Sequence, residues 1–85
     1  MIVVYLSKST DKINGILRNY FFEIKHNFFV GDLSKRVCDE LWNNLILKAY
    51  DSVDGCMLFN YSVESGFKYY KTKGFEMNDL ELNDD

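Results

Sequence analysis

The 85-residue chain has no proline, one histidine, two cysteines and five glycines. Two cysteines without a CxxC spacing exclude a four-ligand zinc site and a disulfide-stapled secreted domain, so Cys38 and Cys56 are expected to be reduced packing thiols. The lone histidine, His26, forms no metal-ligand or Ser/His/Asp pattern with other residues. Because Gly15 and Gly31 are isolated, a glycine-rich phosphate loop is excluded as well.

The chain also lacks a long apolar run. Its apolar stretches fall far short of the roughly 20 residues that a membrane-spanning helix needs, so no membrane segment is expected. No secretory signal is apparent, and reduced cysteines are typical of the cytoplasm. We therefore expect a cytoplasmic protein.

Hydrophobic residues make up 47% of the chain, which predicts one packed domain. A chain of this length buries only about 60–65% of the surface that its unfolded form exposes, so a homodimer is expected. Residues 1–74 hold all ten bases and eight of the thirteen acids, whereas residues 75–85 hold five acids and no base. The sequence therefore predicts a mildly basic domain over 1–74 and an acidic C-terminal tail over 75–85.

The first half of the chain predicts a strand, a helix and a second strand. An apolar, β-branched run over 1–6 is typical of a buried strand, and Ser9, Thr10 or Asp11 can cap the helix that follows. Apolar residues then recur at helical spacing and predict a helix over 11–25; they are Ile13, Ile16, Leu17, Tyr20, Phe21 and Ile24. A short strand is expected over 28–30.

The second half predicts one helix and two strands. Ser34 is the expected cap of a helix that runs to Ala49, and strands are expected over 56–61 and 67–72, joined by a connection of hairpin length. Two helices on one face of a small, mainly antiparallel sheet make an α+β two-layer sandwich of the ferredoxin-like type. Taken alone, these patterns predict a small α+β domain and no function.

Several segments together carry a family resemblance. They are Phe22-Glu23-Ile24, the run FFVGDLS over 28–34, Trp42 in the second helix, and ESGF over 64–67. In this order they resemble the CRISPR-associated Cas-two family, type I-E-like subgroup. The resemblance implies a ferredoxin-like homodimer that joins a Cas-one integrase and holds a short DNA duplex for spacer acquisition, a step of antiviral defence. We interpret the aromatic residues as core and dimer packing.

Metal-dependent catalysis would need an acidic residue at the end of the first strand. Many members of that family are described as metal-dependent nucleases, with an acidic residue at the end of the first strand. The matching position here is Ser7, beside Lys8, and a hydroxyl next to an ammonium group is a poor magnesium site. Asp11, the nearest carboxylate, is expected to begin the helix. We therefore expect no catalytic residue, no metal site and no cofactor, with magnesium needed only if the protein is a nuclease.

The resemblance also implies DNA contacts through basic residues that bind phosphates. Around the start of the first helix the chain offers Lys8 and Lys12, but Asn14 stands at the family's second basic position. After the hairpin, residues 74–77 replace an arginine pair of the family, and Lys71 and Lys73 lie just before them. The DNA-binding candidates are therefore Lys8, Lys12, Lys71 and Lys73.

The tail offers a candidate partner contact. Leu80 and Leu82 alternate as in a very short strand, which could add to a sheet edge of Cas-one; a solvated acidic tail is the alternative. Three functions stay open: a non-catalytic dimeric scaffold of the adaptation complex, a small metal-dependent endonuclease of the same fold, or a protein-binding module that interferes with adaptation.

Overall fold

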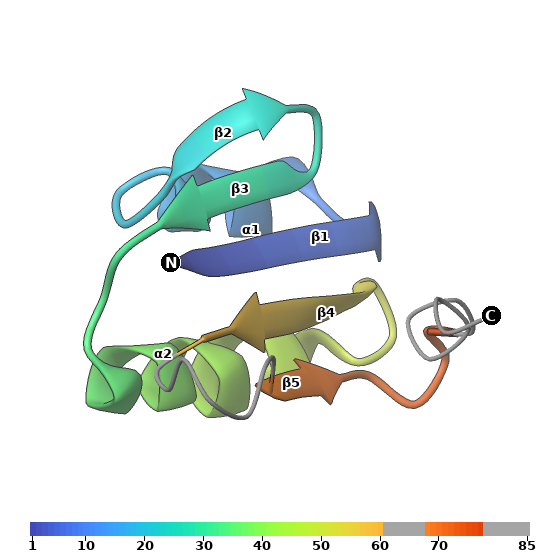
Figure 1. Ribbon diagram of the computed structural model, residues 1–85. Helices are drawn as coiled ribbons and strands as arrows, with labels where there is room; N and C mark the ends of the chain where they lie inside the picture. The colour runs from blue at the N-terminus through green and yellow to red at the C-terminus, as the bar shows by residue number, and fades with distance from the viewer. Residues whose placement is uncertain (61–67, 78–85) are drawn as a thin grey trace, which may run out of the picture.

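The computed structural model describes residues 1–60 and 68–77, in which a five-stranded sheet packs against helices (Figure 1). The elements are β1 (Ile2–Lys8), α1 (Asp11–Leu17), β2 (Phe22–Lys25), β3 (Phe28–Gly31), α2 (Lys35–Leu41), the π-helix η1 (Trp42–Ile46), the 3-10 turn η2 (Leu47–Ala49), β4 (Asp54–Phe59) and β5 (Lys68–Lys71). In these described ranges no helix is long and apolar enough to cross a membrane.

The sheet has the order β2-β3-β1-β4-β5, and every neighbouring pair is antiparallel. The first four strands and the two helices follow a β-α-β-β-α-β path, which is the ferredoxin-like arrangement. β5 adds a fifth strand beside β4. The predicted α+β sandwich of ferredoxin-like type is confirmed.

One face of the sheet forms the core. Phe29, Val4, Met57 and Tyr70 are successive cross-strand partners from β3 to β5, and the first three are fully buried. Both helices bury apolar side chains in the same cluster, so both cover this face. Their buried members are Ile13 and Leu17 of α1, Cys38 and Leu41 of α2, and Trp42 and Ile46 of η1.

The opposite face carries an apolar row that no helix of residues 1–60 and 68–77 covers. Its members are cross-strand partners, one from each strand of the sheet: Phe22, Val30, Val3, Leu58 and Tyr69. Phe22 is 72% exposed and Tyr69 is 49% exposed, while the three central residues are half-buried. We call this set the open row.

The predicted helix over 11–25 is wrong beyond Leu17. The chain turns there, and the backbone N–H groups of Asn19 and Tyr20 bind the carbonyl oxygens of Ile16 and Leu17 at 3.0 and 2.9 Å. β2 follows, because Phe22 and its neighbours gain backbone hydrogen bonds from β3, with which β2 forms a tight hairpin. His26, expected at a helix end, lies in the turn between β2 and β3.

The helix caps agree with the sequence. The hydroxyl of Thr10 accepts a hydrogen bond from the Ile13 N–H at 3.2 Å, and that of Ser34 accepts one from the Val37 N–H at 3.3 Å. The second helical segment reaches Ala49 as predicted, but it widens into the π-helix at Trp42 and tightens into η2. The predicted strands over 56–61 and 67–72 correspond to β4 and β5, and their predicted residues at 61 and 67 lie outside the described residues.

Both cysteines are buried, Cys38 on α2 and Cys56 on β4. Burial raises the pKa of the Cys56 thiol, because the protein interior disfavours the thiolate. Each thiol therefore packs as a small apolar group.

Candidate nucleic-acid interface

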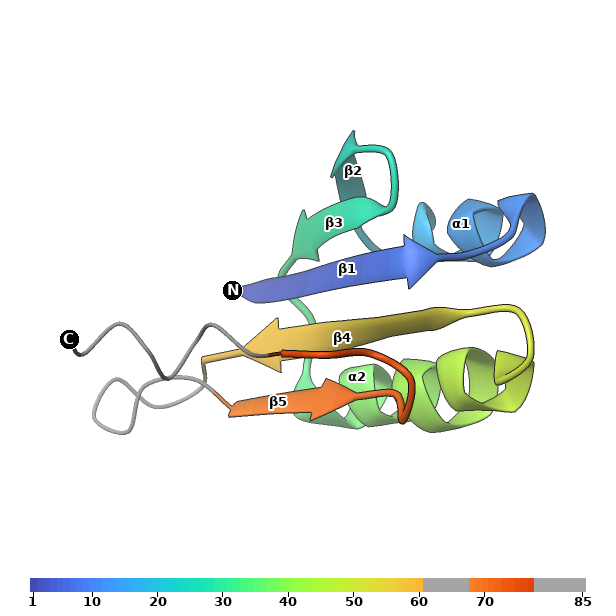
Figure 2. The same ribbon diagram turned by 90° about the vertical axis from the view of Figure 1, so that its right-hand side faces the viewer.

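The end of β1, the start of α1 and the end of β5 lie at one end of the sheet (Figure 2), and the four lysines predicted to bind DNA belong to or directly follow these segments. β1 runs toward this end and finishes at Lys8, which is paired in register with Asp54 at the start of β4. Lys12 lies in the first turn of α1, which begins three residues after β1 ends. β5 is antiparallel to β4, so it finishes with Lys71 at the same end, and Lys73 follows. We call this set, Lys8, Lys12, Lys71 and Lys73, the basic end.

The charge of the basic end is exposed and largely unpaired. All four lysines are exposed, and among the described residues none of them forms an ion pair with an acid. The ammonium group of Lys71 donates to the Thr72 carbonyl oxygen at 3.2 Å. Asp54 is the nearby carboxylate, and its oxygen accepts a hydrogen bond from the Thr72 hydroxyl at 2.8 Å. These lysines can therefore meet phosphates without first breaking an ion pair to a described acid.

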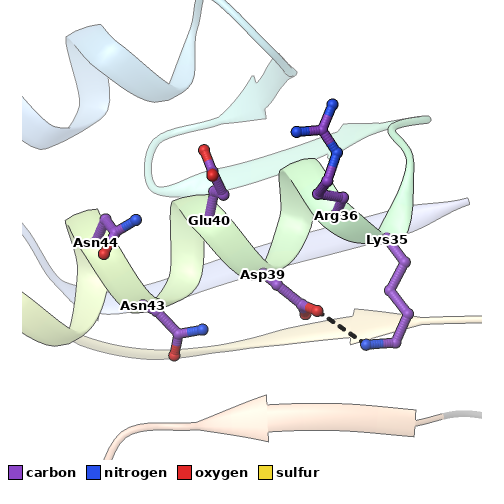
Figure 3. A pocket seen from close by; sticks show the side chains of 6 residues that line it. All are labelled: Lys35, Arg36, Asp39, Glu40, Asn43 and Asn44. Carbon is purple, nitrogen blue, oxygen red and sulfur yellow. Dashed lines mark hydrogen bonds and ion pairs between the residues drawn. The ribbon is translucent and has the colours of Figure 1, made fainter.

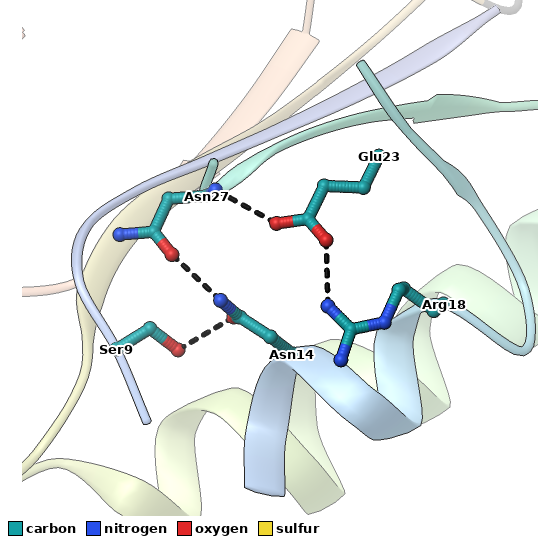
Figure 4. A network of polar contacts seen from close by, with 5 residues as sticks. All are labelled: Ser9, Asn14, Arg18, Glu23 and Asn27. Atoms are coloured by element: carbon teal, nitrogen blue, oxygen red, sulfur yellow. Dashed lines mark hydrogen bonds and ion pairs between the residues drawn. The ribbon is translucent and has the colours of Figure 1, made fainter. Parts of the chain in front are cut away.

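The structure separates Asn14 from this surface. Asn14 is only 3% exposed, and its amide joins two side chains (Figure 4). Its Nδ2 donates to Oδ1 of Asn27 at 2.7 Å, and its Oδ1 accepts from the Ser9 hydroxyl at 2.9 Å. The Asn14 side chain therefore points into the protein and holds the turn between β2 and β3. A basic side chain at this position would not reach DNA from the same orientation.

Arg18 also binds another side chain of the protein, the Glu23 carboxylate. Its guanidinium donates to the Glu23 carboxylate at 2.6 Å, and the other carboxylate oxygen accepts from the Asn27 N–H at 3.0 Å. These contacts, the Asn27 N–H first and then Arg18, hold the pKa of Glu23 below its usual range. Asn27 has a positive φ of 67°, which asparagine tolerates better than most residues. The Glu23 carboxylate therefore fixes a tight turn and balances the Arg18 charge.

A protein-family model matches the sequence along nearly its whole length. A protein-family model described as "CRISPR-associated protein (Cas_Cas2CT1978)" matches residues 1–81. The chain belongs to this Cas-two family. A search of curated proteins finds no significant match.

Ser7 stands at the position where the resemblance implies an acidic, metal-binding residue. Ser7 is exposed at the end of β1, and its hydroxyl donates to the Asp54 carbonyl oxygen at 3.2 Å. Within residues 1–60 and 68–77, no three His, Cys, Asp or Glu side chains gather to hold a metal ion. Asp11 is exposed as the first residue of α1, as predicted. The chemistry at Ser7 therefore does not fit a magnesium ligand set.

The chain after β5 returns over the sheet face opposite the helices. The Phe75 N–H binds the Thr72 carbonyl oxygen at 3.2 Å, and the Phe75 ring contacts that of Tyr5 with centroids 6.0 Å apart. Tyr5 also contacts Phe28 at 6.5 Å. Phe75 stands in the segment that replaces the arginine pair of Cas-two relatives. The predicted partner residues Leu80 and Leu82 lie outside the described residues.

Proposed function

We propose that this Cas-two protein is a non-catalytic, dimeric scaffold of CRISPR adaptation, of the type I-E-like subgroup, that positions duplex DNA for a Cas-one integrase in the cytoplasm. The observation that carries the proposal is the basic end, where lysines of β1, α1, β5 and the residues just after β5 gather without an ion pair to any acid that the structure describes. Exposed lysines of this kind bind the sugar-phosphate backbone without reading the sequence.

The open row supports the dimer. Phe22 and Tyr69 are large apolar side chains on a sheet face that no helix in the described part of the chain covers, and such a contiguous patch is typical of an interaction surface. Two copies that bury this face would make a symmetric particle with two basic ends, one for each half of a duplex. A dimer formed through the open row would therefore set the distance between the two basic ends.

The environment of Ser7 supports a scaffold rather than an enzyme. A symmetric dimer brings a second copy of every residue, but a second Ser7 adds a hydroxyl and no carboxylate. Hydroxyl groups without carboxylates make poor magnesium ligands. The proposal therefore assigns the phosphoryl transfer to Cas-one and the spacing of the DNA ends to this protein.

Light scattering after size-exclusion chromatography tests the proposal. The protein is measured alone, with a Cas-one integrase, and with Cas-one and a short duplex. The expected masses are those of a dimer, then of a complex of both proteins, then of that complex with DNA. A dimer that binds Cas-one and excludes DNA would support the interfering module instead. Cleavage of duplex DNA or RNA that needs a divalent cation would support the endonuclease.

A further inference from the structure

A hollow of about 470 Å³ lies between the start of α1 and the end of the second helical segment. Two lysines line it, Lys12 of α1 and Lys48 of η2, although 36 positions separate them in the sequence. Polar side chains of Thr10, Asn44 and Ser52 complete its polar lining. Lys48 belongs to neither region in which the family resemblance places DNA contacts.

The composition of this hollow suits an anion. No carboxylate is among its lining residues. Asp51, the acid closest to Lys48 in sequence, accepts a hydrogen bond from the Ser52 hydroxyl at 3.2 Å and does not line the hollow. Among the described residues Lys48 has no ion-pair partner. Two ammonium groups beside hydroxyl and amide donors can neutralise and bind a phosphate.

A second hollow on the same helical segment shows the contrast (Figure 3). It is lined by Lys35 and Arg36 but also by Asp39 and Glu40, so its charges cancel. The Lys35 ammonium group is already bound to the Asp39 carboxylate at 2.9 Å. A polyanion gains little from such a surface.

The position of η2 joins the Lys12 hollow to the rest of the basic end. Leu47 and Tyr50, which flank Lys48 and Ala49, line a hollow of about 350 Å³ together with Lys73. η2 therefore lies between the hollow of Lys12 and that of Lys73. A nucleic-acid strand that contacted both Lys12 and Lys73 would cross η2, which carries Lys48.

We propose that Lys48 and Lys12 form a two-lysine clamp on a single phosphate of the DNA backbone, which extends the DNA contacts onto η2. This inference rests on the proposed scaffold function and names a residue that this function does not require. Lys48→Gln removes the charge and keeps the length and helix propensity. Arg36→Gln is the matched control, because Arg36 is an exposed base at the opposite end of the same helical segment.

The test measures duplex affinity of the Cas-one complex by fluorescence anisotropy across a salt series, with thermal melting to confirm folding. Lys48→Gln is expected to lower affinity several-fold at low salt and to reduce the slope of log K against log salt by about 0.9 for each phosphate that the variant no longer neutralises. Arg36→Gln is expected to match the unmodified protein. If Lys48→Gln also matches it while Lys12→Gln weakens binding, the clamp is wrong and the scaffold stands. If the complex binds no duplex, or if neither Lys12→Gln nor Lys48→Gln weakens binding, both the clamp and the proposed scaffold function are wrong.

Discussion

The Tyr70 hydroxyl donates a hydrogen bond to the Asp39 carboxylate and so ties β5 to α2 across 31 residues of sequence. The ring of Tyr70 packs between those of Trp42 and Phe59, with centroid distances of 5.6 and 5.1 Å. The other Asp39 oxygen accepts from the Lys35 ammonium group. This one side chain thus fixes the edge strand that delivers Lys71 and Lys73 to the basic end.

Replacing Tyr70 by phenylalanine is expected to destabilise the protein by about 1 kcal/mol, as measured by urea unfolding. The ring contacts with Trp42 and Phe59 remain, whereas Asp39 loses a donor. The loss is modest because Asp39 is 33% exposed and water can reach it. Tyr50→Phe is the control, since Tyr50 is 79% exposed and its hydroxyl should add little. Equal stability of the two variants would show that the hydroxyl bond contributes nothing.

Stability should fall in acid partly through Glu23. Its folded-state pKa lies below the ordinary value of 4.5, so the stabilisation is present above that value and lost as pH falls through the folded-state pKa. Glu23→Gln should therefore lower the melting temperature at neutral pH, and the difference from the unmodified protein should shrink as the pH falls below 4.5. Glu40→Gln, at an exposed position, is the control. A difference for Glu23→Gln that is independent of pH would contradict this assignment.

Two glycines should respond to alanine with opposite signs. A Cβ at Gly55 would lie 2.2 Å from the Tyr5 carbonyl oxygen, which is backbone of the central strand and has no room to move. Gly55→Ala is expected to cost about 3 kcal/mol. A Cβ at Gly15 meets nothing closer than 3.9 Å, so Gly15→Ala should stabilise α1 by about 1 kcal/mol. Denaturant unfolding of both variants measures these values, and a tolerated alanine at Gly55 would refute the close approach of β4 to β1.

The open row should control the oligomeric state. Phe22→Ser with Tyr69→Ser removes its two most exposed apolar side chains, each worth about 1.5–3 kcal/mol when fully buried. Light scattering should then show a shift from dimer toward monomer, with a dissociation constant raised at least tenfold. Tyr50→Ser, which lies off the sheet, should leave the dimer intact. A dimer that survives the loss of both side chains would place the interface elsewhere.

The sequence predicted most of the fold because its apolar residues follow simple periods. The continuous apolar, β-branched run over 1–6 and the capping residues Thr10 and Ser34 were sufficient for the first strand and both helix starts. β2 was missed because Phe21 and Ile24 continue the helical stripe of α1, whereas Phe22 and Ile24 alternate as in a strand. Pairing with β3 in a tight hairpin decides between the two patterns, and the local signal for that hairpin, the turn at His26 and Asn27, was missed.

The candidate site was predictable only in part. Lys8 and Lys12 are close in sequence, so their common location follows from one strand and one helix. Asn14 offered a signal, since its spacing to Leu17 places it on the buried stripe of α1. Lys48 offered none, because its neighbour Lys12 comes from a helix that only the tertiary packing brings beside η2.

Retention of duplex DNA by the Cas-one complex, measured for two matched double variants, tests the central role of the basic end most directly. The first is Lys12→Gln with Lys73→Gln, and the second is Arg36→Gln with Lys68→Gln, which removes two exposed bases from the opposite end of the sheet. Both complexes should form, and only the first should retain the duplex more weakly, most clearly at low salt, with a salt slope reduced by about 1.8. Equal retention by the two variants would contradict the account.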